Sequence, residues 1–278
     1  MDYKRVLTVQ DISCVGQCSL TVALPIISAC GIEACPLPSA VLSTHTGGFK
    51  GFTFRDLTDD MPAIRQHWLK EGLYFDAVYT GYLGSVKQIG IVSDILAENG
   101  KDGALKIIDP AMADHGKLYP GFDMEFVEAM KGLCGKADYL LPNITEACFL
   151  TDTEYKEDYD RAYVEALLEK LSALGCKSVI FTGISFNKET TGVIVYSNGC
   201  YEYYEHPLLP NSCHGTGDIY ASAFTGALVR GNAPFEAAKI AADYTVECIR
   251  KTAEVEGHWY GACFEPVLGK LIAALDKQ

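Results

Sequence analysis

A short polar segment ahead of an apolar, helix-like run carries the most distinctive chemistry of this sequence. It reads Gly215-Thr216-Gly217-Asp218, and its glycines let backbone N–H groups approach a ligand closely. The free N–H groups of a helix start favour negative charge, such as that of a phosphoryl group in transfer. Asp218 would then accept the proton of an attacking alcohol. A simpler explanation is a favourable contact between Asp218 and the helix dipole.

The two glycines also superficially resemble the start of a dinucleotide-binding fingerprint. That fingerprint directly follows a strand of a βαβ unit and is followed by an acidic residue at the next strand end. Here Pro207 and Pro210 precede the glycines and further helices follow them. The context therefore disfavours a hydride-transfer enzyme.

A second polar motif runs from Asn143 to Glu146 as N-x-x-E. It is typical of a helix start, with Asn143 as the cap and Glu146 in the first turn. It is equally consistent with an acid that holds a hydrated Mg²⁺ beside phosphates, because Mg²⁺ keeps several waters and needs few protein carboxylates. The spacing alone does not decide between the two.

Strand and helix patterns alternate along the chain. Predicted strands cover residues 5–9, 33–42, 77–80, 104–108, 139–141 and 178–182, and an Asn-Gly turn joins a hairpin of residues 192–196 and 200–204. Predicted helices cover residues 17–29, 61–73, 85–99, 122–133, 159–174, 217–229, 234–251 and 266–275. We therefore expect one α/β domain over residues 1–278, with a mostly parallel sheet, helices on both faces and an antiparallel edge.

Polar residues follow six of the predicted strands. They are Gln10-Asp11, Ser43 to Gly48, Gly81 to Gly84, Asp109-Pro110, Asn143 with Glu146, and Thr182-Gly183. Each cluster alone is explained as a turn. Ligands of such sheets bind at the carboxyl ends of the strands, so six clusters on one edge predict a site there.

Composition excludes several classes of partner. A net charge of −13 disfavours nucleic acid and anionic membrane surfaces, and no apolar run reaches the roughly 18 residues of a membrane span. The 11 cysteines include no C-x-x-C pair, which indicates reduced thiols and a cytoplasmic protein and gives no support to a zinc site.

Together these motifs resemble the ribokinase superfamily. The G-T-G-D segment is similar to its signature, and Asn143-x-x-Glu146 is similar to its magnesium motif. Three further segments resemble the pyridoxal kinase family within it, namely Ser43-Thr44-His45-Thr46, Gly81-Tyr82-Leu83-Gly84, and Asp109 to Asp114. Their order and spacing agree from Val6 to about Leu228.

The resemblance implies a ribokinase-like three-layer sandwich with nine or ten strands, usually a homodimer. It implies ATP-dependent phosphorylation of the 5′-hydroxymethyl group of pyridoxal, pyridoxine or pyridoxamine, with Mg²⁺ and a monovalent cation such as K⁺. Asp218 is the implied base, and Gly215, Thr216 and Gly217 form the anion hole. The implied substrate pocket is Asp11, Thr46, Gly47 and Tyr82. The implied nucleotide contacts are Asp109, Asn143, Glu146, Thr182, Gly215 and Gly217, with Asp109 and Glu146 at the metal.

Two residues depart from the family pattern. Asp11 stands where many pyridoxal kinases have a serine that contacts the pyridine ring; an aspartate there can pair with a protonated ring nitrogen, and it leaves the substrate spectrum open. Leu141 replaces a smaller or hydroxylated residue and changes a nucleotide contact. The neighbouring hydroxymethylpyrimidine kinases are an alternative, and so is a non-catalytic binder of vitamin B6 or nucleotide.

Two segments near the predicted site have no role in that scheme. Cys213 and His214 precede the anion hole, and we interpret them as packing and turn residues. Residues 114–121 contain glycines and a proline, and their composition and position predict a loop that covers the site.

Overall fold

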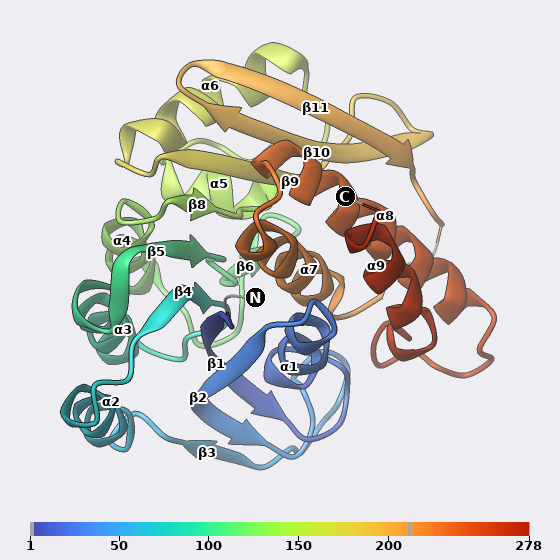
Figure 1. Cartoon of the computed structure of the whole chain (residues 1–278). Helices are drawn as coiled ribbons and strands as arrows, with labels where there is room; N and C mark the ends of the chain where they lie inside the picture. Colours follow the sequence, from blue (N-terminus) through green and yellow to red (C-terminus); the bar gives the residue numbers. More distant parts are fainter. Residues whose placement is uncertain (1–2, 211–212, 278) are drawn as a thin grey trace.

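The computed structural model describes residues 3–210 and 213–277, and a nine-stranded sheet forms its centre (Figure 1). The strand order is β11-β10-β9-β8-β5-β4-β1-β2-β3. The pairs from β9 to β2 are parallel, whereas β10, β11 and β3 pair in antiparallel fashion. The strands are β1 Arg5–Ser13, β2 Glu33–Leu42, β3 Phe54–Asp56, β4 Phe75–Thr80, β5 Gly100–Ile108, β8 Tyr139–Leu140, β9 Ser178–Ile184, β10 Thr190–Ser197 and β11 Cys200–Pro207.

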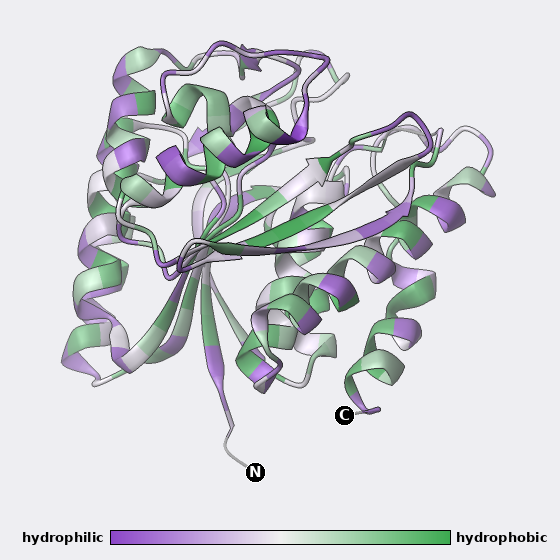
Figure 2. Cartoon of the chain, turned by 90° about the horizontal axis from the view of Figure 1, so that it is seen from above, coloured by the Kyte–Doolittle hydropathy of each residue, from purple (hydrophilic) through white to green (hydrophobic). Residues whose placement is uncertain are grey.

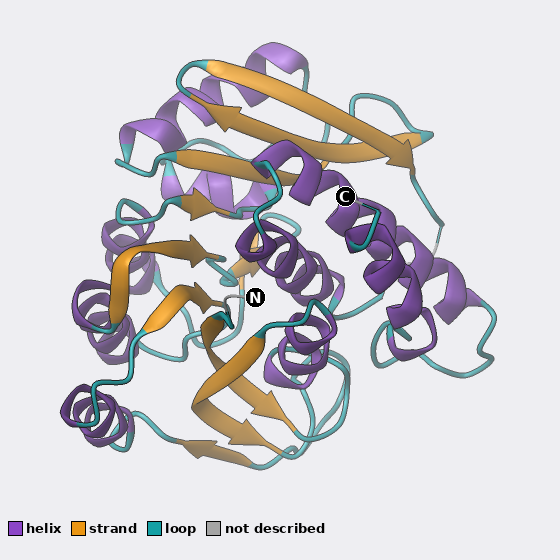
Figure 3. Ribbon diagram, in the orientation of Figure 1, coloured by secondary structure: helices purple, strands orange, loops and turns teal. Residues whose placement is uncertain are grey.

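Helices cover both faces of this sheet (Figure 3). One face packs against α1 (Leu20–Ala29), α7 (Thr216–Arg230), α8 (Pro234–Ala253) and α9 (Leu268–Leu275). The other packs against α2 (Met61–Lys70), α3 (Val86–Glu98), α4 (Met124–Cys134), α5 (Ile144–Leu150) and α6 (Arg161–Ala173). The predicted α/β class, with helices on both faces and an antiparallel edge, is confirmed.

Alternate residues of the central strands supply two separate cores. On β4, Ala77 and Tyr79 enter the core beneath α1 and α7, whereas Val78 enters the core beneath α3 and α4. This follows from the two-residue period of a strand. Strands buried on both faces are expected to be apolar, and Figure 2 shows green along several of the strands, whereas the helices alternate between green and purple.

The antiparallel hairpin is confirmed, with Ser197 opposite Cys200 and left-handed backbone at Asn198 and Gly199. Other boundaries differ from the prediction. The first helix begins at Leu20 instead of residue 17, because Gln17 and Ser19 have φ angles of 51° and 55° that an α-helix excludes.

The last helix was predicted to begin at residue 266, but α9 begins at Leu268, because a 3₁₀ turn over Glu265–Val267 precedes it. The prediction missed β3, whose three residues are all exposed and lack an apolar face. It also missed the two-stranded ribbon of β6 (Ala113–Asp114) and β7 (Lys117–Leu118), which lies within the predicted cover loop.

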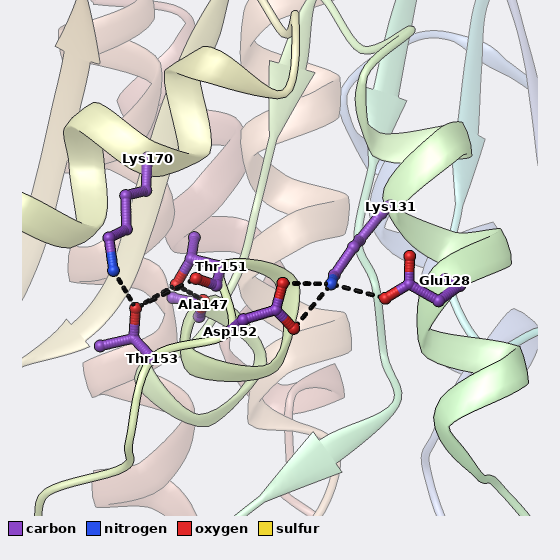
Figure 4. A network of polar contacts seen from close by, with 7 residues as sticks. All are labelled: Glu128, Lys131, Ala147, Thr151, Asp152, Thr153 and Lys170. Carbon is purple, nitrogen blue, oxygen red and sulfur yellow. Dashed lines mark hydrogen bonds and ion pairs between the residues drawn. The ribbon is translucent and has the colours of Figure 1, made fainter.

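A polar network joins the ends of α4, α5 and α6 (Figure 4). Lys131 Nζ donates to Glu128 at 2.7 Å and to both oxygens of Asp152 at 2.8 Å. Lys170 Nζ donates at 2.8 Å to the hydroxyl of Thr153. Exposed ion pairs contribute roughly 0–1 kcal/mol each, so this network mainly orients the three helices. No helix between residues 3 and 277, as far as the chain is described, has both the length and the apolarity of a membrane span.

A close approach of α1 and α7 generates a stability prediction. A Cβ atom at Gly226 would lie 2.3 Å from Cys30 Sγ and 2.8 Å from Cys30 Cβ. Gly226→Ala should therefore lower the free energy of unfolding by about 1–3 kcal/mol, as overpacking does. Gly132→Ala is the control: Gly132 is an exposed residue of α4 with open space around it, and the change should raise stability by up to about 1 kcal/mol. Urea unfolding measures the free energy of unfolding of both variants. Equal changes in the two would contradict the close contact between Gly226 and Cys30.

Candidate active site

Hydrogen bonds join the carboxyl ends of the central strands into one edge. The N–H of Gly81, after β4, donates to Val9 O at 3.2 Å, and the N–H of Asp109, after β5, donates to Thr80 O at 3.0 Å. Leu141 then donates to Ile108 O at 2.8 Å, and Thr182 of β9 donates to Pro142 O at 3.1 Å. The clusters that follow β4, β5 and β8 therefore lie along one rim with the last residues of β1 and β9, as expected for parallel strands. Gln10-Asp11 and Thr182-Gly183 were predicted to follow their strands, but β1 and β9 extend through them to Ser13 and Ile184.

The start of α7 meets this rim through a tight turn. Gly215 precedes the helix with a φ of 77°, and a Cβ atom there would lie 2.1 Å from Gln17 O. Both the left-handed backbone and this contact require glycine. At Gly217 nothing lies within 4 Å of an added Cβ, so the first turn faces open space. The Thr216 hydroxyl donates to Cys213 O at 3.4 Å, which closes the turn.

Asp218 lies half-buried in the first turn of α7. Burial raises the pKa of its carboxyl group to about 7; the Ser19 backbone N–H opposes that rise and the charge of Asp11 adds to it. A general base works best when its pKa lies near the working pH. The position of Asp218 thus gives a proton acceptor suited to neutral solution.

Asn143 and Glu146 form a capping box at the start of α5, which confirms the structural interpretation of the N-x-x-E motif. Asn143 Oδ1 accepts from Glu146 N at 2.9 Å, and Glu146 Oε2 accepts from Asn143 N at 2.9 Å. Glu146 Oε1 accepts from Met112 N at 3.0 Å. Burial nevertheless raises the pKa of Glu146 to about 7, although these N–H groups lower it.

Asp109 follows β5 at the same rim. Its Oδ1 accepts from Ala111 N at 3.0 Å, and Ala111 has a left-handed φ of 39°. Burial raises the pKa of Asp109 well above its ordinary value, and the charges of Glu146 and Asp218 raise it further. Asp109 is thus close enough to Glu146 and to Asp218 for their negative charges to act on it.

The donor set fits a hydrated Mg²⁺. Within residues 3–210 and 213–277 no group of three or more His, Cys, Asp or Glu residues forms a closed metal cage. Mg²⁺ needs none, because it usually takes one or two carboxylates together with waters and substrate phosphates. Both Glu146 oxygens already accept backbone N–H groups, so Glu146 suits contact through a metal-bound water, whereas Asp109 Oδ2 is available for direct contact.

A second group of predicted residues comprises Asp11, Thr46, Gly47 and Tyr82. Asp11 is buried at the end of β1, and the Tyr82 ring stacks on Phe122 with centroids 5.5 Å apart. Burial raises the pKa of Tyr82, and the charge of Asp11 raises it further, so the two side chains are neighbours. Gly47 packs against His45 and His214, whereas Thr46 is exposed.

Ser19 is a site residue that the sequence did not reveal. Its hydroxyl lowers the pKa of Asp11 and its backbone N–H lowers the pKa of Asp218, so it lies between the two acids. Its backbone has the rare combination φ 55° and ψ −129°. Strained residues cluster at functional sites. A serine in the sequence does not predict this backbone conformation, so Ser19 could not be identified from the sequence.

The segment 258–261 contacts the loop of residues 43–49, and the sequence did not reveal this contact either. His45 Nδ1 accepts from Gly47 N at 3.0 Å, so its Nε2 must carry the proton that it donates to Tyr260 O at 2.7 Å. Trp259 packs on Phe49 with centroids 4.7 Å apart. His258 Nε2 bonds Gln17 Oε1 at 2.8 Å, which ties the same segment to the loop before α1.

The structure also locates Cys213-His214 and the predicted cover loop of residues 114–121. The His214 ring lies 5.1 Å from that of His45, and Cys213 packs against the core beneath α7, in agreement with packing roles. The predicted cover loop contains the β6–β7 ribbon, which is tied to α5 by bonds from Asn143 Nδ2 to Ala113 O at 2.9 Å and from Gly116 N to Thr145 Oγ1 at 3.0 Å.

Comparison with known proteins assigns the family. The model of the phosphomethylpyrimidine kinase family matches residues 24–263. The chain belongs to this family. It is a kinase, a phosphotransferase of the ribokinase superfamily, as the sequence motifs predicted.

Similar proteins of this family include two solved structures. A Bacteroides thetaiotaomicron protein, described as a candidate phosphomethylpyrimidine kinase and crystallised with pyridoxal, is 40% identical with a TM-score of 0.91, covering 99% of this chain and 96% of its own. Pyridoxal kinase from Lactobacillus plantarum is 30% identical with a TM-score of 0.91, covering 100% and 99%. Pyridoxal kinase from Dictyostelium discoideum is 28% identical over 81% of this chain and 78% of its own.

The raised pKa of Asp218 predicts a pH dependence of stability. Between about pH 4 and pH 7 the unfolded chain loses this proton while the folded chain keeps it, because the pKa rises from 3.8 to about 7 on folding. The free energy of unfolding of the ligand-free protein should therefore fall as pH rises through that window. Asp218→Asn should flatten the slope in urea unfolding at several pH values. An unchanged slope would show that Asp218 ionises normally.

Proposed function

We propose that this kinase phosphorylates the 5′-hydroxymethyl group of vitamin B6, with ATP as the donor. The observation that carries the proposal is the place of Asp218 in the first turn of α7, where its charge acts on Asp109 and the charge of the buried Asp11 acts on it. Asp218 could there accept the proton of an alcohol bound near Asp11 while the phosphate of the donor lies near Asp109. The 40% identical Bacteroides protein crystallised with pyridoxal supports the choice of substrate.

The nucleotide would lie along the rim formed by the ends of β8 and β9. Asn143 begins α5 there, and Thr182 Oγ1 bonds Pro142 O at 3.2 Å beside it. When bound, Mg²⁺ would neutralise phosphate charge, held by Asp109 directly and by Glu146 through water. K⁺, a homodimer and a single domain over residues 1–278 remain part of the proposal on the strength of the family resemblance.

In the proposed reaction, the carboxylate of Asp218 accepts the proton of the substrate hydroxyl. The freed oxygen attacks the γ-phosphorus and the bond to the bridging oxygen breaks, which leaves ADP and the phosphate ester. The N–H groups of the Gly215–Gly217 turn and the α7 dipole stabilise the negative charge on the transferred group. Tyr82 and Gly47 would confine the ring so that the hydroxymethyl group points to Asp218.

Asp218→Asn tests the role of the base. It should leave ATP affinity nearly unchanged and lower kcat by about 10²–10⁴-fold, the usual loss for a general base. The matched control is Asp158→Asn, an exposed residue between α5 and α6, which should leave both values unchanged. Steady-state kinetics and calorimetric titration with ATP give the two quantities. Turnover of Asp218→Asn close to that of the wild type would exclude this role.

A second candidate substrate is hydroxymethylpyrimidine, because the matching family model describes phosphomethylpyrimidine kinases. Both heterocycles carry a hydroxymethyl group, so the same residues would serve. The acidic pocket should favour the more basic pyridine ring. We expect a higher kcat/KM for pyridoxine than for 4-amino-5-hydroxymethyl-2-methylpyrimidine in a coupled ADP-release assay, and the reverse order would assign the pyrimidine.

A further inference from the structure

Three polar side chains are fully buried where α7 packs against the sheet. They are Gln10 of β1, Tyr79 of β4 and Ser222 of α7. Their Oε1, Oη and Oγ atoms make no hydrogen bond with any residue that the structure describes. Buried polar groups of native proteins almost always have a partner, so a group of three such atoms needs a specific explanation.

The two strand residues lie on the face of the sheet that packs against α7. Tyr79 belongs to the core beneath that helix and pairs with Thr8 of β1. Gln10 follows Thr8 by two residues on the same face, and its Nε2 donates to Thr8 Oγ1 at 2.8 Å. The irregularity of β1 at Asp11 comes only after Gln10. A Cβ atom at Gly81 would lie 2.6 Å from Gln10 Oε1, so this oxygen lies over the backbone that follows β4.

The Tyr79 hydroxyl faces the other two polar groups. Burial raises its pKa well above the ordinary value for tyrosine, and the charges of Asp109 and Asp218 raise it further. The side chains of Ser222 and Gln10 lower the same pKa, so the hydroxyl lies close to both. Because no direct hydrogen bond joins the three groups in the described chain, a small polar bridge between them would satisfy all of them at once.

One water molecule has the donors and acceptors that these groups need. An amide oxygen only accepts, whereas each hydroxyl both donates and accepts. The raised pKa of Tyr79 keeps its hydroxyl protonated and therefore able to donate. A water could accept from Tyr79 Oη while it donates to Gln10 Oε1 and Ser222 Oγ. That makes about three hydrogen bonds, the number typical of a buried water.

Such a bridge would join the helix of Asp218 to the strands that carry its neighbours. Ser222 follows Asp218 by four residues on α7, so the two side chains lie on one face of the helix. Tyr79 directly precedes Thr80, whose carbonyl group accepts the Asp109 N–H at 3.0 Å. The apolar contacts of α7 are non-directional. Hydrogen bonds through a water, in contrast, fix where the helix stands along the strands.

We propose that Gln10, Tyr79 and Ser222 bind one buried water molecule, and that this water sets the position of Asp218 relative to the sheet. The inference rests on the role of Asp218 as the base in the proposed function, but not on which heterocycle is the substrate. Tyr79 and Ser222 are positioning residues in this scheme, because they act on the reaction only through the place of Asp218. Water-mediated hydrogen bonds are nearly as favourable as direct ones, so one water is enough for this task.

A crystal structure of the wild-type protein tests the water itself. At a resolution that shows ordered waters, one water should lie about 2.5–3.2 Å from each of Tyr79 Oη, Ser222 Oγ and Gln10 Oε1. Electron density without a water among these atoms would overturn the proposal. Direct hydrogen bonds among the three side chains would overturn it as well, since they leave the water without a role.

Two deletions of a hydroxyl group test the positioning role. Tyr79→Phe and Ser222→Ala should each lower kcat about 3–30-fold, less than the roughly 10²-fold cost of a 1 Å misplacement. The KM values for ATP and for the better of pyridoxine and hydroxymethylpyrimidine should change by less than about 2-fold, because neither residue contacts a substrate. The double variant should lose about as much as the more damaging single one, since both residues act through one water.

Tyr220→Phe is the matched control. It removes the same atom from a buried tyrosine of α7 whose hydroxyl also lacks a hydrogen bond within the described residues, but burial alone raises the pKa of Tyr220, without a contribution from the acids. Its kcat should stay within about 2-fold of the wild type. An equal loss in this control, losses that multiply in the double variant, or an unchanged kcat in both single variants would overturn the positioning role. If a variant fails to fold, the wild-type crystal still decides the water.

The results separate this inference from the proposed function. Turnover of Asp218→Asn close to that of the wild type would refute the proposed base, and the positioning role with it. If Asp218→Asn loses turnover as predicted while the losses at Tyr79 and Ser222 multiply, only this inference fails.

Discussion

The removal of neighbouring carboxyl groups from water is the constraint on which the organisation of this protein depends. Asp109, Glu146 and Asp218 meet at one rim, and burial raises the pKa of each. Backbone N–H groups are the protein partners that lower the pKa of these acids, and they do so only in part. Such a site is unfavourable in the free protein and becomes favourable when a ligand supplies protons or positive charge. Binding and stability are therefore linked through the same three side chains.

The hydrophobic core beneath α7 holds the acidic site in position. From Ile219 to Val229 every residue of α7 is buried, so Asp218 directly precedes the fully buried part of its own helix. The contact of Gly226 with Cys30 keeps that helix against α1, and the contact of Gly215 with Gln17 O brings its first turn to the loop after β1. The hydrophobic packing thus fixes the position of Asp218, as the proposed role of a base requires.

The sequence allowed the class of fold and the location of the site to be predicted, because both follow from patterns in neighbouring residues. Apolar periodicity located the central strands and most helices, and the rule for parallel sheets placed Asp109, Asn143 and Thr182 on one rim. Asn143 and Glu146 illustrate the limit, since their spacing fits a cap and a metal site equally and the structure confirms the cap. The φ angle of Ser19, the irregularity at Asp11 and the bond between His45 and Tyr260 depend on distant residues and on backbone strain, for which the local sequence holds no signal.

The bond between His45 and Tyr260 has a consequence for how the protein is made. The two residues are separated by 215 positions, so the ribosome synthesises the loop of residues 43–49 long before the segment 258–261 that contacts it. The sheet strands β1, β2, β4 and β5 are all complete by Ile108 and can pair early. The contacts of His45 with Tyr260 and of Phe49 with Trp259 can form only after the segment 258–261 has emerged. A nascent chain can therefore contain these four strands while the loop around His45 still lacks the contacts that fix it.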